Sequence, residues 1–223
     1  MKTAAVIGLG YVGLPLACLL AKKGFKVYGI DKDENKVSLV NKKICPFKDK
    51  KLEKELKNCK ISAASDFKAL RKTNIIVICV PTPVDSAHHP DLKPLISAAE
   101  SVAKELKKGH LIVVESTIFP GTIEDIVKPI LERNGMKAGR DFYLAHCPER
   151  IDPGNKKWDV SNIPRVVGAT SKKGLKKASA FYRAFLNGNV KELSTVKAAE
   201  AVKITENTFR DVNIAFVNEL ARS

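Results

Sequence analysis

Short apolar segments and longer amphipathic segments alternate along almost the whole chain. Uninterrupted apolar runs, such as residues 75–80, are typical of parallel strands that are buried on both faces of a sheet. The pattern predicts strands at residues 3–8, 26–30, 75–80, 110–115, 142–145 and 164–168. It predicts helices at residues 12–23, 34–41, 50–56, 95–106, 122–133 and 172–186, with Gly24 and Gly109 as C-terminal caps. This order indicates an α/β fold with an open, doubly wound, mostly parallel sheet between two layers of helices.

The last stretch, residues 196–223, differs from the rest because the pattern predicts one long helix there. Apolar residues cover most of its circumference, and such a helix needs burial nearly all round. They are Val202, Ile204, Phe209, Val212, Ile214, Phe216, Val217 and Leu220. We therefore expect a second chain or a further part of the same protein to cover it. The chain then divides into a domain at residues 1–195 and the start of a long central or dimerisation helix at residues 196–223.

Composition and charge narrow the class of protein. Of the 223 residues, 44% are hydrophobic and 28% are charged, which excludes a disordered tail and a small disulfide-stapled module. The net charge of +15 favours anionic partners. We interpret the lysine-dense stretch at residues 42–60 as a solvated helix face, and we expect no nucleic-acid partner.

The sequence shows no segment that targets the chain to a membrane. No apolar run approaches the roughly 20 residues that a membrane span needs, and the start does not resemble a signal peptide. The five cysteines (Cys18, Cys45, Cys59, Cys79 and Cys147) are odd in number and include no Cys-x-x-Cys pair. Reduced thiols, no metal site and a cytoplasmic location are therefore expected.

A glycine-rich string joins the first predicted strand to the first predicted helix. Gly8, Gly10 and Gly13 have Gly-x-Gly-x-x-Gly spacing, and Asp31 ends the second predicted strand. Such a turn lets the backbone approach a pyrophosphate, while the acidic residue accepts hydrogen bonds from ribose hydroxyls. A carboxylate repels a 2′-phosphate, so NAD is favoured over NADP, although Lys32 keeps the alternative open. The sequence thus predicts a Rossmann-like NAD site.

Four further strings lie at or near predicted strand or helix ends, at residues 80–83, 115–122, 146–155 and 199–207. Ligands of an open parallel sheet bind outside the carboxyl ends of its strands, so the first three strings should converge on one crevice. In the fourth, Lys203 and Asn207 are four residues apart and should share one helix face. That pair is equally compatible with ordinary surface polarity.

Together these strings resemble the nucleotide-sugar 6-dehydrogenases, which oxidise the C6 alcohol of a UDP- or GDP-sugar to a carboxylate with two NAD. The Pro-Glu-Arg-x-x-Pro-Gly-Asn form at residues 148–155 is similar to the branch that acts on UDP-N-acetylmannosamine and UDP-N-acetylglucosamine. The resemblance implies a UDP-N-acetylhexosamine substrate, with UDP-N-acetylmannosamine as first choice, in polysaccharide biosynthesis. It also implies a homodimer formed through the C-terminal helix.

The resemblance also assigns roles to single residues. It implies catalytic roles for Glu149, Lys203 and Asn207, with Glu149 in acid–base steps and Lys203 near the reacting oxygen. It implies contacts to NAD by Tyr11, Val12, Asp31, Lys36, Thr82 and Thr117. It implies contacts to the substrate by Arg150, Ile151, Lys203, Asn207 and Arg210.

The chain departs from this family in one respect. The family captures the aldehyde on a cysteine that lies well beyond the Lys-x-x-x-Asn helix, and this chain stops at Ser223 before any such string. Nothing near Cys147 suggests an activated thiol that could replace it. The expectation is an NAD-binding part that does not complete the oxidation alone.

Two other hypotheses stay open at this stage. A β-hydroxyacid dehydrogenase shares the glycine-rich start and a Lys-x-x-x-Asn helix and needs only one hydride transfer, but it lacks the string at residues 148–155. A non-catalytic nucleotide-binding or dimerisation module would need no reacting residues at all.

Overall fold

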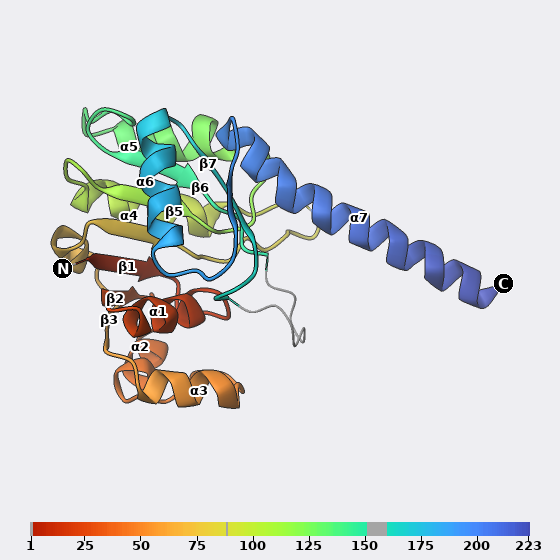
Figure 1. Ribbon diagram of the computed structural model, residues 1–223, viewed down its shortest axis with the longest axis horizontal. Helices are drawn as coiled ribbons and strands as arrows, with labels where there is room; N and C mark the ends of the chain where they lie inside the picture. The colour runs from red at the N-terminus through yellow and green to blue at the C-terminus, as the bar shows by residue number, and fades with distance from the viewer. Residues whose placement is uncertain (1, 88, 151–159) are drawn as a thin grey trace.

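One twisted sheet organises the molecule, with helices on both of its faces (Figure 1). The computed structural model describes residues 2–87, 89–150 and 160–223. The eight strands lie in the order β3-β2-β1-β4-β5-β6-β7-β8. They are β1 (Thr3–Ile7), β2 (Lys26–Ile30), β3 (Ile61–Ala64), β4 (Ile75–Ile78), β5 (Leu111–Val114), β6 (Tyr143–His146), β7 (Arg165–Ala169) and β8 (Val190–Glu192). Every pairing is parallel except that of β6 with β7.

The helical segments are divided between the two faces, which confirms the predicted doubly wound α/β architecture. They are α1 (Gly13–Lys22), α2 (Glu34–Asn41), α3 (Lys50–Lys57), η1 (Lys68–Lys72), α4 (Lys93–Glu105), η2 (Ile123–Val127), α5 (Lys128–Glu132), α6 (Lys172–Arg183) and α7 (Val196–Arg222). Apolar residues of α1, α3 and α6 fill the core on one face. Those of η1, α4, η2, α5 and the first turn of α7 fill the core on the other face.

The two edge strands, β3 and β8, are the strands that the apolar pattern did not predict, and the short helix η1 was not predicted either. In β3 only Ile61 is buried, and in β8 only Val190 is buried. An edge strand borders solvent on one side, so it lacks the continuous apolar run that marks a central strand.

One predicted helix has an unexpected first turn, and one predicted helix cap is wrong. The helix expected at residues 122–133 begins as a π-helical turn, η2, and only then continues as α5. Pro129 has no N–H to donate and its ring crowds the carbonyl of the preceding turn, which favours this widening. Gly109 is not a helix cap, because α4 ends at Glu105 and Leu106 is extended; its φ of +90° serves the turn before β5. Gly24, with a φ of +84°, directly follows α1 as expected.

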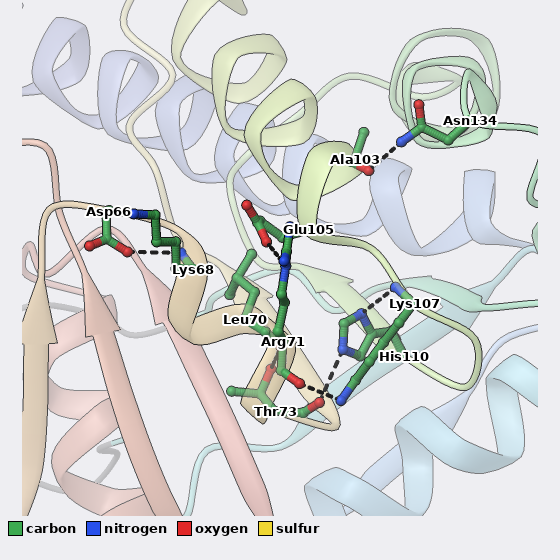
Figure 2. Close-up of polar contacts among 10 residues, drawn as sticks. All are labelled: Asp66, Lys68, Leu70, Arg71, Thr73, Ala103, Glu105, Lys107, His110 and Asn134. Atoms are coloured by element: carbon green, nitrogen blue, oxygen red, sulfur yellow. Dashed lines mark hydrogen bonds and ion pairs between the residues drawn. The ribbon is translucent and has the colours of Figure 1, made fainter.

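Polar groups at the amino ends of β4 and β5 form a closed network (Figure 2). The buried His110 ring contacts the Thr73 carbonyl oxygen through Nε2 at 3.0 Å and accepts from the Lys107 N–H through Nδ1 at 3.3 Å. Arg71 forms an ion pair with Glu105 above it. These contacts join η1 to the turn between α4 and β5 at the amino ends of the strands.

Helix α7 starts on the sheet and then leaves the domain (Figure 1). Its start packs directly on β7 because Gly168 has no side chain; a Cβ there would lie 2.5 Å from the Thr195 carbonyl oxygen and 2.8 Å from the Ala199 Cβ. Beyond this contact the predicted long helix is confirmed, and its apolar side chains from Phe209 onward are more than half exposed.

Candidate functional site

The glycine-rich turn between β1 and α1 permits a backbone packing that no other residue type allows. Gly8 has a φ of +90°, and a Cβ on it would lie 2.6 Å from the Cys79 carbonyl oxygen of the neighbouring β-strand end. A Cβ on Gly13 would lie only 1.8 Å from the Gly8 carbonyl oxygen. The helix therefore begins in direct contact with the turn, as a phosphate-binding turn of this type requires.

The first turn of α1 has no side-chain cap, a feature that it shares with α4 and α5 but not with four other helices of the described chain. Side chains of Asp33, Asp49, Ser171 and Thr195 cap α2, α3, α6 and α7, whereas Val12 gives α1 no side-chain cap. The first N–H groups of a helix lack partners inside the helix and carry partial positive charge. An anion such as a pyrophosphate fits this uncapped start.

Asp31 lies at the carboxyl end of β2 and organises the other side of the turn. Its carboxylate accepts hydrogen bonds from Leu9 N–H at 2.8 Å, from Asp33 N–H at 3.1 Å and from Lys36 Nζ at 2.9 Å. Burial raises the pKa of Asp31, but the three donors outweigh it and hold the pKa below its ordinary value. A carboxylate offers about four acceptor positions, so one is left for a ribose hydroxyl.

A cleft of about 840 Å³ opens along the carboxyl ends of the strands. It brings together nearly all residues that the sequence analysis assigned to NAD. Those lining it are Gly8, Gly10, Tyr11, Val12, Asp31, Lys36, Thr82 and Thr117. Gly13 is not among them because it packs behind the turn. The glycine-rich turn, the Asp31 carboxylate and the neighbouring strand ends thus line one continuous cleft, and these groups fit a dinucleotide.

An aromatic pair borders the cleft at the glycine-rich turn. The exposed ring of Tyr11 lies 4.2 Å, centroid to centroid, from the ring of Phe47 in the lysine-dense stretch. This contact joins the segment between α2 and α3 to the turn. The stretch at residues 42–60 therefore includes one residue that packs beside the site, in addition to its solvated lysines.

Three further charged residues line the same cleft. Glu115 follows β5, Glu149 follows β6, and Lys203 comes from α7, far from both in the sequence. The Glu149 N–H donates to the Glu115 carbonyl oxygen at 3.4 Å, so the two strand ends run side by side. Glu149 and Lys203, both assigned to catalysis, therefore border the same cleft as the NAD residues.

Glu115 is held by a buried network that the sequence analysis missed. Its carboxylate accepts from the Tyr182 hydroxyl at 2.6 Å and lies 3.5 Å from the Arg165 guanidinium, and all three side chains are buried. Burial raises the pKa of Glu115 above its ordinary value, and Arg165 opposes that shift. The only sequence signal was an acidic residue at the end of an apolar run. Other lining residues that the sequence analysis did not name include Phe67, Asp91, Ser97 and Ser101, whereas Ser116 belongs to the predicted string at residues 115–122.

Of the described residues assigned to the substrate, Lys203 lines the cleft, whereas Arg150, Asn207 and Arg210 lie outside its lining. Arg150 forms an ion pair with Glu206 of α7 and donates to the Pro164 carbonyl oxygen at 3.0 Å. Both members of that pair line a second hollow of about 680 Å³ on α7, together with Arg210. Asn207 lies outside the lining of both hollows and accepts from Arg210 at 3.1 Å. Lys203 and Asn207 are four residues apart on one continuous helix, as expected, but only Lys203 lines the cleft.

The remaining expectations concern Ile151, the thiol of Cys147, a metal site and a membrane-spanning helix. Ile151 lies outside the described residues. Cys147 is buried, and burial raises its pKa to about 12, which keeps the thiol protonated. Within residues 2–87, 89–150 and 160–223, no group of three or more His, Cys, Asp or Glu could hold a metal ion. In the same ranges, no helix has the length and apolarity to cross a membrane.

The parallel sheet, the uncapped glycine-rich turn and the strand-end cleft define a dinucleotide-binding dehydrogenase domain. Residues 2–186 match the NAD binding domain of the UDP-glucose/GDP-mannose dehydrogenase family, and residues 197–223 match the central domain of that family. The chain belongs to this family, and NAD is the cofactor of its domain.

The most informative relatives are enzymes of the N-acetylhexosamine branch. The chain is 40% identical to the UDP-N-acetyl-D-glucosamine 6-dehydrogenase of Pseudomonas aeruginosa, covering 97% of this chain and 51% of that protein. It is 38% identical to the UDP-N-acetyl-D-mannosamine dehydrogenase of Pyrococcus horikoshii, with 97% and 52% covered. The chain spans about half the length of the curated relatives it matches.

Solved structures agree with the sequence relatives. The UDP-D-ManNAc dehydrogenase of Pyrococcus horikoshii superposes with a TM-score of 0.92 at 37% identity, covering 98% of this chain and 53% of that one. The GDP-mannose dehydrogenase of Pseudomonas aeruginosa superposes with a TM-score of 0.91 at 30% identity, covering 98% and 52%. A 3-hydroxyisobutyrate dehydrogenase from Mycobacterium tuberculosis, at 17% identity and a TM-score of 0.71, shares the fold alone.

Proposed function

We propose that this chain is the NAD-binding part of an enzyme that oxidises the C6 alcohol of a UDP-N-acetylhexosamine to the uronate. UDP-N-acetylmannosamine is the first-choice sugar. The observation that carries the proposal is the meeting of Glu149 and Lys203 with the NAD-binding turn in one cleft. The names of the relatives, which act on UDP-N-acetylglucosamine and UDP-N-acetylmannosamine, support the substrate class.

The chain's own residues divide the work of the first oxidation. The uncapped start of α1 holds the pyrophosphate and Asp31 holds the ribose, while Thr82 and Thr117 contact the cofactor farther along the cleft. When bound, NAD accepts the hydride that leaves C6. The ammonium of Lys203 stabilises the negative charge that develops on the alcohol oxygen as its proton leaves, and Glu149 accepts protons.

The remaining assignments concern the substrate and the partner chain. Arg150, Ile151, Asn207 and Arg210 contact the sugar nucleotide, and the basic character of this set suits its diphosphate. Residues 1–195 form the NAD-binding domain and residues 196–223 begin the central helix. The free cysteines suit a reducing compartment, so we place the enzyme in the cytoplasm.

The cofactor and the reaction are tested separately. The 223-residue chain is titrated with NADH by fluorescence, and reduction of NAD is then followed with UDP-N-acetylmannosamine, UDP-N-acetylglucosamine and small hydroxyacids. We expect saturable NADH binding without full turnover to the uronate. Reduction of NAD by hydroxyacids but not by nucleotide sugars would contradict the substrate class. Complete oxidation to the uronate would contradict the need for a thiol outside this chain.

A homodimer through α7 is the proposed assembly. It is supported by the row of exposed apolar side chains that includes Phe209, Phe216 and Val217. Light scattering should give a dimer for the wild-type chain and a monomer for Val217→Glu. The control, Ser65→Glu, alters an exposed residue far from α7 and should leave the dimer intact. A wild-type monomer at high micromolar concentration would contradict the assembly.

A further inference from the structure

Glu200 is a fully buried carboxylate in the second turn of α7, and no role assigned so far uses it. Its two oxygens accept hydrogen bonds from the N–H groups of Gly121 and Ile123, both at 2.7 Å. Burial raises the pKa of Glu200, and these two N–H groups act in the opposite direction. Burying a charged group costs free energy unless the group is paired. The buried position of the Glu200 carboxylate therefore indicates that its contacts have a structural or functional role.

The two donors lie at the start of the η2–α5 segment. Thr122 gives that segment no side-chain cap, so Glu200 supplies the cap from a different helix. The first N–H groups of a helical segment carry partial positive charge, which favours a carboxylate there. Glu200 thereby ties α7 to the loop that follows β5, and Thr117 of the same loop lines the NAD cleft.

The hydrogen bonds of Glu200 are directional, so they restrict the rotation of α7 about its axis. The other contacts at the start of the helix include the packing of Ala199 on Gly168, the buried Val196 and an exposed ion pair of Lys197 with Glu124. Residues three apart are neighbours on one helix face, so Lys203 lies next to Glu200 along the helix. Beyond Lys203 the helix leaves the domain, and the Arg150–Glu206 ion pair is only partly buried.

We infer that Glu200 is a positioning residue that holds the start of α7 in the orientation that places Lys203 in the cleft. This inference rests on the proposed function, because Lys203 is useful there only if a reacting oxygen binds beside it. Loss of the Glu200 contact should release Lys203 toward solvent while leaving the glycine-rich turn and Asp31 as they are.

The test compares the chain with Glu200→Gln, which keeps the size of the side chain but leaves one oxygen to serve two donors. Both proteins are labelled with a small acylating reagent. Peptide mass spectrometry then measures the acylation rate of Lys203 relative to that of the exposed Lys173 of α6. We expect Lys203 to react about threefold faster or more in Glu200→Gln, the scale of a shift transmitted through packed side chains. NADH affinity should stay within about threefold, since the nucleotide half of the cleft is unchanged.

Two further variants make the result specific. Glu219→Gln alters an exposed carboxylate on the same helix and should match the wild type. Glu200→Asp keeps the charge on a shorter side chain, so its Lys203 labelling rate should lie between those of the wild type and Glu200→Gln. This variant also provides the test if Glu200→Gln does not fold. An unchanged Lys203 rate in a folded Glu200 variant overturns the inference. Failure of the wild-type chain to bind NADH overturns the proposed function instead, because the labelling rates are measured without cofactor.

Discussion

Polar residues lie at both ends of the parallel strands, but those at the amino ends bond within the protein, whereas those at the carboxyl ends line a cleft. At the amino ends, the buried His110 ring bonds to both the Thr73 carbonyl oxygen and the Lys107 N–H, so these polar groups are satisfied within the protein (Figure 2). At the carboxyl ends, polar residues border a cleft of about 840 Å³, and the adjoining start of α1 has no side-chain cap. A buried polar residue therefore indicates a binding site only where its surroundings leave volume and unpaired backbone donors for a ligand.

This contrast predicts that substitutions at the two ends will separate binding from stability. Changes at the carboxyl ends should weaken NADH binding, while changes at the amino ends should lower the free energy of unfolding alone. The variants that follow test this separation.

The largest effect is expected for Gly13→Ala, which affects both quantities. Its Cβ would lie 1.8 Å from a backbone oxygen, so α1 must move away from the turn. We expect about 100-fold weaker NADH binding in a fluorescence titration and a loss of about 1–3 kcal/mol in urea unfolding. The control is Gly10→Ala, where a Cβ meets nothing within 4 Å, so stability should hold while binding weakens. Wild-type affinity in Gly13→Ala would contradict the phosphate-binding turn.

Asp31→Asn should come next, with its main effect on binding. The neutral amide loses the charge-assisted bond to Lys36 and weakens the ribose contact, so NADH affinity should fall by about 10–30-fold. The lowered pKa of Asp31 means that its stabilisation is present above the ordinary value of 3.8 and is lost as the pH falls through the lower value. Acid unfolding of Asp31→Asn should lack that contribution.

Asp33→Asn is the matched control for this position. Asp33 lies two residues away and caps α2, and asparagine caps a helix about as well. Its NADH affinity should stay within about twofold of the wild type. If both variants lose affinity equally, the effect belongs to the loop and not to the Asp31 carboxylate.

His110→Ala should lower stability without changing binding. It removes a buried ring and leaves the Thr73 carbonyl oxygen and the Lys107 N–H without that partner, which costs about 1–3 kcal/mol. Urea unfolding measures the loss, and NADH titration should match the wild type. His89→Ala, at an exposed histidine, is the control and should leave stability unchanged. A parallel loss of NADH affinity in His110→Ala would show that the two ends are coupled.

The smallest effect is a pH dependence of stability. Burial lowers the pKa of His146 to about 3, so the folded state keeps this ring neutral where the unfolded chain takes up a proton. The contribution of the neutral His146 ring to the free energy of unfolding is therefore complete above the ordinary pKa of 6.5 and is lost as the pH falls toward 3. The free energy of unfolding then falls by up to about 1.4 kcal/mol per pH unit. His146→Leu should unfold with a shallower pH dependence between pH 6.5 and 5. Glu115 and Glu200 titrate in both proteins, so the difference isolates the histidine; equal slopes would contradict it.

Much of the fold follows from short-range patterns. The central strands β1, β2, β4 and β5 were predicted because burial on both faces demands uninterrupted apolar runs. The glycine-rich turn and Asp31 were predictable as a set because one β-α-β unit brings them together within about thirty residues of sequence. The edge strands β3 and β8 escaped the pattern because half of their surroundings is solvent.

The other half of the site depended on contacts that no local pattern encodes. Spacing alone placed Lys203 and Asn207 on one face, but the path of α7 puts Lys203 in the cleft and leaves Asn207 outside both hollows. The carboxylates of Glu115 and Glu200 resembled ordinary polar positions in the sequence. Their roles emerged only from their partners, Tyr182 with Arg165 and the N–H groups of Gly121 and Ile123.

By itself, the sequence determined the doubly wound sheet, the glycine-rich turn and the position of Asp31 beside it, because each depends on periodicity or on residues that are close along the chain. Tertiary structure alone decided which charged residues share the cleft, how α7 is held against the domain, and which polar residues are sealed in networks. Those outcomes depend on the packing of segments separated by 50 residues or more, such as Glu115 and Arg165, whose proximity has no signature in the order of residues.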